Sequence, residues 1–544
     1  MKSIQIITKT ILTATSIFIL ASCFDHLDRF PENETTAKEV FSTFDGYKGA
    51  LAKIYASFAL TGNQGPAGQP DVAGLDEGQN ADFLRNWFNH QEMPTDQAHC
   101  IWTDVGIAQL NNINFASDAS NGRFTVGLYS RCLMQIMYVN EFLRNSSDLG
   151  SGKGFTSQQT EEIRYFRAEA RFMRAFSWWV LLDAFGNLPF MDESSNLSDL
   201  PKQIKRVDLF NYIETELLDL TNNNLLKAAR TNEYGRADIA AGNALLARLY
   251  LNAEIYTGTQ RWNDALTHAK KVIDAGFTLK ANYEELFFAD NHLDNNETIL
   301  AITYDGRYTR NYGGTTFLIN APGQSAYQNT YRETVIHWGI SNDDRFGWAG
   351  YRVRKQFVDK FATNDKRFLF VGEEPEIGSN PTVYRSGLAT YKYRNIKRGS
   401  TVENPIFGDD PRGEYSDVDF PLFRLAEMYL IFAEAVTRGA SGGTMSEAAG
   451  YFNLLRERAF GNNTNNVATL TAQDVLDERA RELYWECHRR TDLIRFGQFT
   501  TDAYIWEWKG GVQEGRAIGN HFNLFPIPDP DRNANPNLEQ NHGY

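Results

Sequence analysis

The sequence predicts a mainly α-helical protein in which a helical scaffold carries a loop-rich part. The scaffold is expected mainly in residues 38–60, 126–276 and 420–496, where apolar residues recur at steps of three or four, the period of one helical face. The loop-rich part is expected mainly in residues 61–125 and 277–419, where Gly- and Asn-rich loops and a few short β-rich runs replace that period. With 544 residues, of which 42% are hydrophobic, the chain can bury a large core.

The most regular helical pattern spans Thr156 to Phe190. Thr156 and Gln159 have the spacing of a capping box at a helix N-terminus, and Gly186 followed by Pro189 is a typical stop. Two rows of apolar residues run along this helix, so we expect neighbouring helices to cover it on two sides. Four arginines form a basic stripe on it, namely Arg164, Arg167, Arg171 and Arg174. We assign this stripe to ion pairs with neighbouring helices.

Further helices are predicted from the same period at 38–60, 126–142, 207–220, 237–256, 262–275, 421–438, 445–459 and 472–489. The pair 237–256 and 262–275 resembles a tetratricopeptide hairpin, because small residues at Ala240, Ala244 and Ala247 allow the helices to approach closely. A similar pair follows at 421–438 and 445–459. One β-rich run is expected at 298–304.

The first 22 residues have the features of a lipoprotein signal peptide, with an apolar run too short to span a membrane. The run ends in Leu20-Ala21-Ser22-Cys23, which resembles a bacterial lipobox and implies cleavage before Cys23 and lipidation of that residue. Residues 23–37 would form a polar tether and residues 38–544 a single domain. The alternative is an ordinary signal peptide with a chance cysteine.

The charge and the cysteines exclude several classes of protein. A net charge of −14 argues against nucleic-acid binding, which needs a basic surface to meet phosphate. Besides Cys23 the chain has Cys100, Cys132 and Cys487. Three cysteines without close spacing form neither a disulfide framework nor a metal site, so we expect them to be buried as small apolar side chains.

Several stretches, spread in order across the chain, resemble the SusD/RagB family of outer-membrane nutrient-binding lipoproteins. Beside the lipobox they are RAEARFMRAFSWWVLLDAFGNLPF at 167–190, GRADIAAGNALLARLYL at 235–251, FPLFRLAEMYLIFAEA at 420–435, ERARELYWECHRRTDLIRFG at 478–497 and FPIPDPDRNANPNLEQNHGY at 525–544. The resemblance implies the SusD-like fold, with about four tetratricopeptide-like helical hairpins that carry a loop-rich ligand-binding part.

Shorter stretches resemble the starch-binding members of this family: LDEG at 75–78, MPTD at 93–96, TRNYGG at 309–314, GW at 347–348 and YIWEWKGG at 504–511. In such proteins an arc of aromatic rings cradles a helical α-glucan, and Asp, Asn and Arg side chains bind the sugar hydroxyls. The resemblance implies that Trp102, Tyr312 and Trp348 form the arc here, with Asp76 and Arg85 as the polar contacts.

These residue types suit sugar chemistry. A sugar ring has an apolar C–H face and a rim of hydroxyls, so its site needs flat aromatic surfaces and a few directed hydrogen-bonding groups. The alternative is loop packing for each ring and a surface ion pair for the two polar residues. The chain departs from the family pattern at Thr103-Asp104-Val105, where an Asn is expected just after Trp102, and Trp338 could take the place of Trp348.

The sequence therefore predicts a non-catalytic glycan-binding lipoprotein, anchored to the outer membrane and exposed at the cell surface. Its ligand would be starch or maltooligosaccharide, which it would pass to a TonB-dependent, SusC-like transporter. The first alternative is the same role for another neutral glycan: a β-glucan, a fructan or a hemicellulose. More remote are a protein-docking scaffold and a glycoside hydrolase using two of the carboxylates Asp76, Glu77, Asp82 and Asp96.

This hypothesis requires no cofactor, although the sequence contains candidate ligands for a structural calcium ion. The Asp/Asn-rich stretch 290–297 and the nearby pair Asp417 and Asp419 offer hard oxygen ligands. Asp294 and Asp419 are the candidate calcium ligands. The alternative is that these residues are a solvated loop and helix caps.

Overall fold

The computed structural model describes residues 37–63, 65, 69–148, 153–323, 338–339, 347–372 and 387–544. The predicted signal peptide, the predicted lipidation site Cys23 and residues 24–36 of the predicted tether lie outside this range. Within it, no helix is both long enough and apolar enough to cross a membrane.

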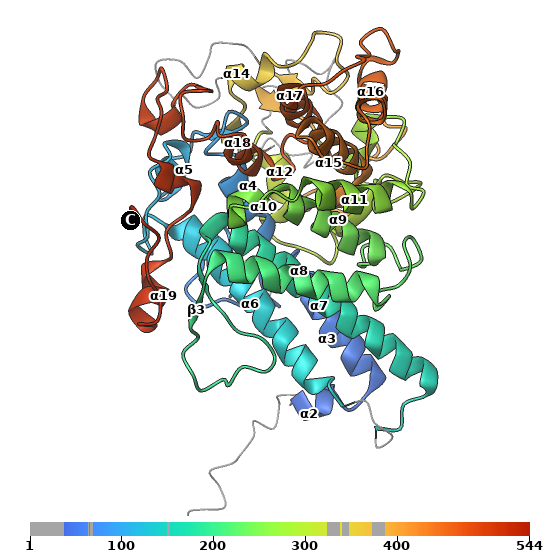
Figure 1. Cartoon of the computed structure of the whole chain (residues 1–544), viewed down its shortest axis with the longest axis vertical. Helices are drawn as coiled ribbons and strands as arrows, with labels where there is room; N and C mark the ends of the chain where they lie inside the picture. The colour runs from blue at the N-terminus through green and yellow to red at the C-terminus, as the bar shows by residue number, and fades with distance from the viewer. Residues whose placement is uncertain are drawn as a thin grey trace, which may run out of the picture.

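The helices of the scaffold follow one another as a stack of neighbours. They are α2 (Ala37–Val40), α3 (Phe44–Ala56), α6 (Arg123–Asn145), α7 (Ser157–Phe185), α8 (Arg206–Asn222), α9 (Ile239–Leu251), α10 (Ala253–Thr257), α11 (Trp262–Ile273), α15 (Leu425–Thr437), α16 (Met445–Phe460), α17 (Ala472–Glu482) and α18 (Arg489–Arg495). Figure 1 shows the stack passing from α3, α6 and α7 at its lower end through α8, α9 and α11 to α15, α16 and α17 at its upper end. The predicted mainly α-helical class is confirmed.

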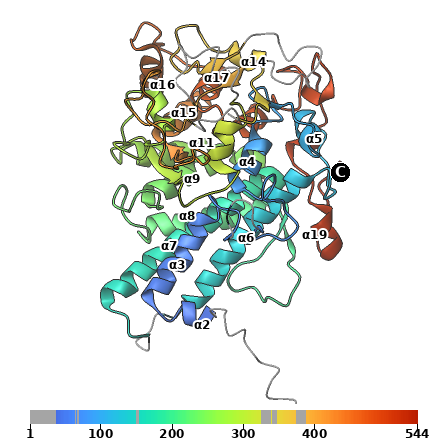
Figure 2. The same ribbon diagram turned by 180° about the vertical axis from the view of Figure 1, so that it is seen from behind.

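The other part is built from short elements joined by loops. Its helices are α4 (Phe83–Gln91), α5 (Ile107–Asn111), α12 (Gly314–Asn320), α14 (Lys355–Val358) and α19 (Asp529–Ala534), with 3-10 turns η2 (Tyr283–Phe287), η3 (Lys509–Gly511) and η4 (Asn520–Asn523). Four antiparallel pairs of strands occur among the described residues: β1 (His99–Cys100) with β5 (Tyr351–Arg352), β2 (Leu188–Pro189) with β3 (Gln203–Ile204), β4 (Thr298–Ile302) with β8 (Phe420–Arg424), and β6 (Phe370–Val371) with β7 (Ala389–Thr390). Helix α4 lies against α6 of the scaffold (Figure 2), and α12 packs against α4.

Helix α7 forms as its sequence predicts. The Thr156 hydroxyl accepts from the Gln159 amide and the Gln159 side chain accepts from the Thr156 amide, which completes the capping box. The helix ends before Gly186, whose φ of 76° favours glycine. From Phe172 to Phe185 every side chain is buried, so the helix lies at the centre of the core.

Two of the four arginines in the basic stripe of α7 make the predicted ion pairs with a neighbouring helix. Arg171 and Arg174 both pair with Glu216 of α8, at 2.8 and 3.0 Å. Arg167 donates to the Leu143 carbonyl at the end of α6. Arg164 instead pairs with Glu161 of its own helix. The stripe therefore ties α7 mainly to α6 and α8.

The helix predicted at 38–60 is divided into α2 and α3, and two further predicted helices differ from the observed elements at their boundaries. The segment predicted as helix from residue 421 begins as strand β8, because it pairs with β4 before α15 starts at Leu425. The helix predicted to reach residue 489 ends at Glu482. There the Glu482 carbonyl accepts from Arg424 at 2.6 Å and from the Tyr283 hydroxyl at 2.8 Å, so tertiary donors replace the next helical amide.

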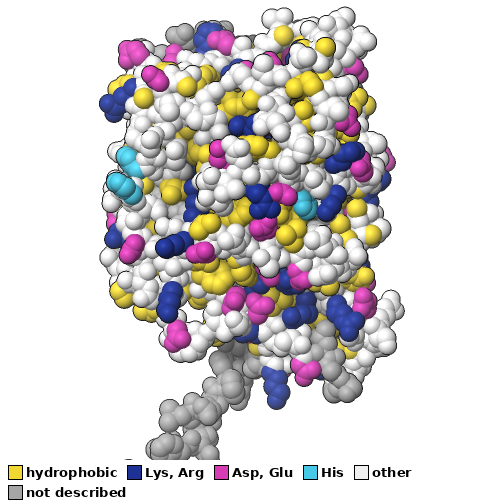
Figure 3. Space-filling view, viewed as in Figure 1, with side chains coloured by type: hydrophobic (Ala, Val, Ile, Leu, Met, Phe, Trp, Pro, Cys, Tyr) yellow, Lys and Arg dark blue, Asp and Glu magenta, His cyan; other side chains and the backbone are white. Residues whose placement is uncertain are grey.

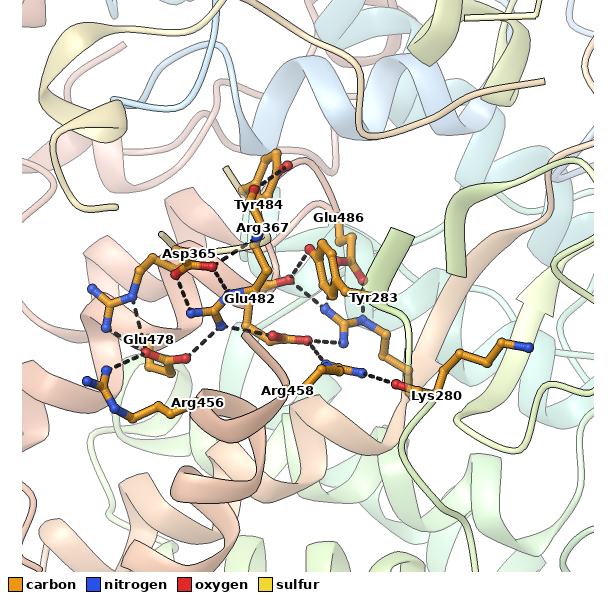
Figure 4. Close-up of polar contacts among 12 residues, drawn as sticks. Lys280, Tyr283, Asp365, Arg367, Arg456, Arg458, Glu478, Glu482, Tyr484 and Glu486 are labelled. Atoms are coloured by element: carbon orange, nitrogen blue, oxygen red, sulfur yellow. Dashed lines mark hydrogen bonds and ion pairs between the residues drawn. The ribbon is translucent and has the colours of Figure 1, made fainter. Parts of the chain in front are cut away.

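A buried network of charges joins this C-terminal scaffold to the loop-rich part (Figure 4). Arg367, Arg424 and Arg458 each contact Glu482, and their side chains are at most 4% exposed. The network continues through four more acidic side chains, Asp365, Glu478, Glu297 and Glu486. Burial alone would raise the pKa of Glu482, but the three arginines outweigh it and hold that pKa well below its usual range.

The surface carries charges of both signs, and the remaining cysteines are internal. Figure 3 shows acidic and basic side chains interspersed on one face, with no large area of a single sign. Cys100, Cys132 and Cys487 are buried free thiols, as predicted.

Candidate functional site

Strand pairing brings two of the predicted rings together. In the β1–β5 pair Cys100 lies opposite Tyr351, and the Ile101 amide donates to the Gly350 carbonyl at 2.9 Å. Trp102 lies two residues after β1 and Trp348 three residues before β5, so this register sets their rings side by side. The ring centroids are 6.4 Å apart and the ring planes are inclined by 50°.

Gly350 determines how Trp102 lies. A Cβ atom at Gly350 would fall 1.9 Å from the Trp102 indole, so only glycine leaves room for the ring against the backbone. The indole nitrogen of Trp102 donates to the Trp348 carbonyl at 3.3 Å. The position of Trp102 is therefore fixed by the segment that carries Trp348.

Tyr312 extends the row from the other side. Its ring centroid is 6.4 Å from that of Trp348, at an interplanar angle of 64°. Helix α12 begins just after Tyr312, and its last carbonyl, that of Asn320, accepts from the Trp348 amide at 2.6 Å. This short helix therefore holds both rings. We call Trp102, Trp348 and Tyr312 the aromatic row; each of its rings is partly exposed.

The start of α12 is tied to the start of α4. The Asp82 carboxylate caps α4 by accepting from the Arg85 amide at 2.7 Å, and it also accepts from the Gly314 amide at 2.9 Å. Asn311 donates to the Ala59 carbonyl and accepts from the Gly313 amide. These bonds fix the loop that presents Tyr312.

The alternative tryptophan, Trp338, lies in the core. Its side chain is fully buried and its indole nitrogen donates to the Thr390 carbonyl at 3.2 Å. Trp348, not Trp338, therefore completes the row.

The two predicted polar contacts differ in exposure. Arg85 is only 6% exposed; its guanidinium lies 5.9 Å from the Trp102 ring centroid and 4.8 Å from that of Phe317, and it donates to the Gly78 carbonyl at 2.6 Å. Burial lowers the pKa of Arg85. Asp76 is exposed, and its nearest basic partner is Arg123 at 3.7 Å. Arg85 thus supports the row from beneath, whereas the Asp76 carboxylate faces solvent.

Three further carboxylates near the sequence motifs have structural partners. Asp82 caps α4, as described. Asp96 is buried and receives two bonds from Arg489, at 2.7 and 2.8 Å. Glu77 is 9% exposed, and burial raises the pKa of its carboxyl to about 7, although bonds from Thr61 and the Tyr312 backbone oppose the shift.

The two candidate calcium ligands have separate partners. Asp294 is exposed and pairs with Arg398 at 3.1 Å. Asp419 is buried and accepts from the Tyr304 amide at 2.8 Å, and burial raises the pKa of its carboxyl to about 7. No group of three or more His, Cys, Asp or Glu side chains that could hold a metal ion occurs in the described part of the chain. The calcium site stays a prediction.

The sequence analysis did not predict the residues outside the aromatic row that contact the Tyr312 side chain. The Tyr312 hydroxyl donates to Glu414 at 2.9 Å, and the Tyr415 ring lies 5.7 Å away. Arg310 lies over Tyr415 at 4.9 Å. Arg310 falls within the TRNYGG motif and could have been found there, but nothing in the sequence around Glu414 connects it with Tyr312.

Comparison with known proteins shows what family has this architecture. The model of the SusD family matches residues 307–544. The starch-binding protein SusD of Bacteroides thetaiotaomicron is 36% identical to the chain, over 98% of the chain and 99% of that protein. The chain belongs to the SusD family.

Less similar proteins match the chain over most of its length, one in sequence and two in fold. A SusD-like protein of Bacteroides ovatus is 23% identical over 92% of the chain and 86% of its own length. A SusD superfamily protein from Parabacteroides distasonis superposes with a TM-score of 0.69 at 20% identity, covering 94% of this chain and 100% of that one. Surface glycan-binding protein A from Bacteroides thetaiotaomicron, in complex with laminarihexaose, gives 0.65 at 19% identity, covering 91% and 99%. The family predicted from the sequence motifs is confirmed.

Proposed function

We propose that this SusD family protein is a non-catalytic surface glycan-binding protein and that its ligand is an α-glucan, starch or maltooligosaccharide. The observation that carries the proposal is the aromatic row: three partly exposed rings, supplied by separate loops, whose centroids follow one another at 6.4 Å. Such rings match the apolar faces of successive sugar residues, and loops on a rigid scaffold are a usual place for binding residues.

The inclination of the rings favours a curved glycan. Successive planes turn by 50° and 64°, so the row is not flat. A helical α-glucan turns its sugar faces along the chain, whereas a straight, ribbon-like chain would suit coplanar rings. The 36% identity to starch-binding protein SusD supports the same choice. A different neutral glycan is the second candidate, because a structural neighbour is a complex with laminarihexaose.

The polar residues complete the proposed site. Asp76 would accept hydrogen bonds from sugar hydroxyls, since its carboxylate faces solvent. Arg85 would act mainly by holding the Trp102 ring, with its small exposed edge available to a hydroxyl. We expect the affinity of one short chain to be weak, because ordering a flexible glycan offsets much of the contact energy.

The carboxylates favour binding over hydrolysis. A glycosidase needs two carboxyl groups that flank the scissile bond. Of the four candidates, Asp82 and Asp96 are buried with structural partners, Glu77 is nearly buried and Asp76 alone is exposed. We therefore propose that the chain performs no chemistry. We further propose that it is anchored by lipid at Cys23 to the outer membrane and delivers glycan to a TonB-dependent, SusC-like transporter.

Affinity electrophoresis tests the ligand. A soluble form starting after Cys23 should be retarded by amylopectin and not by xylan or levan, and calorimetry should rank maltohexaose above laminarihexaose. Retardation by xylan or levan alone would contradict the starch assignment. Trp102→Ala and Tyr312→Ala should each remove retardation while the melting temperature stays near that of the wild type, with Trp338→Phe as a core variant that still binds. Hydrolysis of maltohexaose that is lost in Asp76→Asn would contradict the non-catalytic proposal.

A further inference from the structure

A polar recess lies between the loop after α5 and the C-terminal part of the chain. Its volume is about 530 Å³, and its walls come from the loop after α5 and from the C-terminal segment 510–522. Figures 1 and 2 both show α5 beside this C-terminal segment. The walls carry the side chains of Asn112, Asn114, Arg516 and Phe522 and the exposed backbone of Gly510 and Gly511.

The polar groups of this recess have hydrogen-bonding capacity to spare. Asn112 and Asn114 donate their backbone amides to Ala108 and Gln109, and their side-chain amides have no partner among the described residues. Arg516 donates through Nε to the Gly510 carbonyl at 3.2 Å and pairs with no carboxylate in the same part of the chain. Three side chains therefore present free donors or acceptors to one cavity.

The shape of the recess depends on glycine. Gly510 and Gly511 have φ values of 70° and 77°, which other residues adopt only with strain. A Cβ atom at Gly511 would lie 3.4 Å from Cβ of Asn112 and would narrow the cavity. Opposite them, the partly exposed Phe522 ring is held edge-on by Phe115 at a centroid distance of 5.5 Å.

The chemistry fits a sugar residue better than an anion. An aromatic face beside amide and guanidinium groups offers the combination that a sugar ring requires. A single exposed arginine, with Glu514 two residues away in a chain of net charge −14, makes a poor anion site.

The recess is close enough to the row to take part in the same binding event. The Asn111 side chain bonds to the amide and the carbonyl of Cys100, at 3.1 and 2.6 Å. Because Asn112 follows Asn111 and Trp102 lies two residues after Cys100, the Cα atoms of Asn112 and Trp102 are no more than about 20 Å apart. One glycan chain of several sugars can span this distance.

We propose that this recess is a second glycan subsite, which binds a further part of the same chain that lies on the aromatic row. The proposal rests on the proposed function of the row. A second contact on one ligand acts at high effective concentration, so even a weak subsite raises the affinity for long chains and leaves that for short ones unchanged.

The test compares Asn114→Ala/Arg516→Ala with the control Asn463→Ala/Arg164→Ala, which removes equally exposed side chains elsewhere. The recess variant should bind amylopectin about 3- to 10-fold more weakly than the control, while both bind maltotriose like the wild type. Equal binding of amylopectin by the two variants would overturn the proposal. A wild type that binds none of the glycans would instead refute the function of the row.

A second measurement removes the row. In Trp102→Ala/Tyr312→Ala, maltoheptaose at high concentration should still slow hydrogen exchange in the peptide 508–523, and adding Asn114→Ala/Arg516→Ala should abolish that protection. Protection by sodium sulfate and not by maltoheptaose would overturn the proposal in favour of an anion site.

Discussion

The buried charge network and the aromatic row differ in the charge of their side chains and in their exposure to solvent. In the network, Arg367, Arg424 and Glu482 are at most 1% exposed, and each has several charged partners. In the row, uncharged rings are partly exposed; backbone bonds set the two tryptophans, and the charged side chains Arg85 and Glu414 contact Trp102 and Tyr312. Ionisable groups stabilise the fold where water is excluded, and neutral ring surfaces remain at the proposed glycan site.

The two regions also differ in what they connect. The network joins loop residues near position 365 to strand β8 and to helices α16 and α17, and so fastens the loop-rich part to the scaffold. The row lies on that fastened part and is set by one short strand pair and one short helix. Damage to the network should therefore reduce stability, whereas damage to the row should reduce binding.

The largest expected loss of stability follows from a substitution in the buried charge network. Arg424→Met removes the partner of Glu297, Glu482 and Glu486, and breaking a buried ion pair by removing one side costs about 3–5 kcal/mol. Urea unfolding should show this loss. The matched control is Arg164→Ala, whose exposed pair with Glu161 is worth less than about 1 kcal/mol. Equal midpoints for the two variants would contradict the structural role of the network.

The next largest effect is expected for Gly350→Ala, which should reduce both the stability of the protein and its glycan binding. The new Cβ atom would overlap the Trp102 indole, so the ring must leave its place in the row or the β1–β5 pair must shift. We expect a stability loss of about 1–3 kcal/mol and loss of glycan retardation. Gly450→Ala, in helix α16 with open space around it, is the control and should stabilise by about 0.5–1 kcal/mol. Normal binding by Gly350→Ala would show that the Trp102 position is not needed.

The helical part could be predicted from sequence because its period is local. The predicted boundaries were wrong where contacts between residues far apart in the sequence determine the structure. Strand β8 forms because β4 lies beside it, and α17 ends because Arg424 and Tyr283 bond to the Glu482 carbonyl. The rings of the row were predicted from family motifs. Gly350 and Glu414 were not, since their roles depend on contacts that span large sequence separations and leave no local pattern.

The stability of the protein should depend on pH through Glu77, a nearly buried carboxyl that accepts a bond from the Tyr312 backbone. Its pKa is raised to about 7 from 4.5, so the folded state binds a proton that the unfolded state releases between these values. The stabilising contribution is complete below pH 4.5 and is lost as the pH rises through 7. Glu77→Gln should therefore be equal to the wild type at pH 4.5 and more stable at pH 8 by about 1–2 kcal/mol, about half of the roughly 3 kcal/mol that the full pKa difference would give, because water still reaches part of the carboxylate. Thermal unfolding across this range measures the difference; parallel curves would contradict the assignment.

The smallest effect expected on stability is that of Asp76→Asn. The amide oxygen can still accept from the Gly78 amide as the carboxylate does, and the exposed contact to Arg123 at 3.7 Å contributes little, so the melting temperature should not change. If Asp76 binds a sugar hydroxyl, replacing a charged acceptor by a neutral one weakens binding by about 0.5–1.5 kcal/mol, or about 2- to 12-fold. Asp118→Asn is the control, because Asp118 is partly exposed and accepts from backbone amides two and three residues ahead. Calorimetry with maltohexaose should show weaker binding by Asp76→Asn than by Asp118→Asn. Equal affinities would show that Asp76 does not contact the sugar and that ring stacking accounts for binding at the aromatic row.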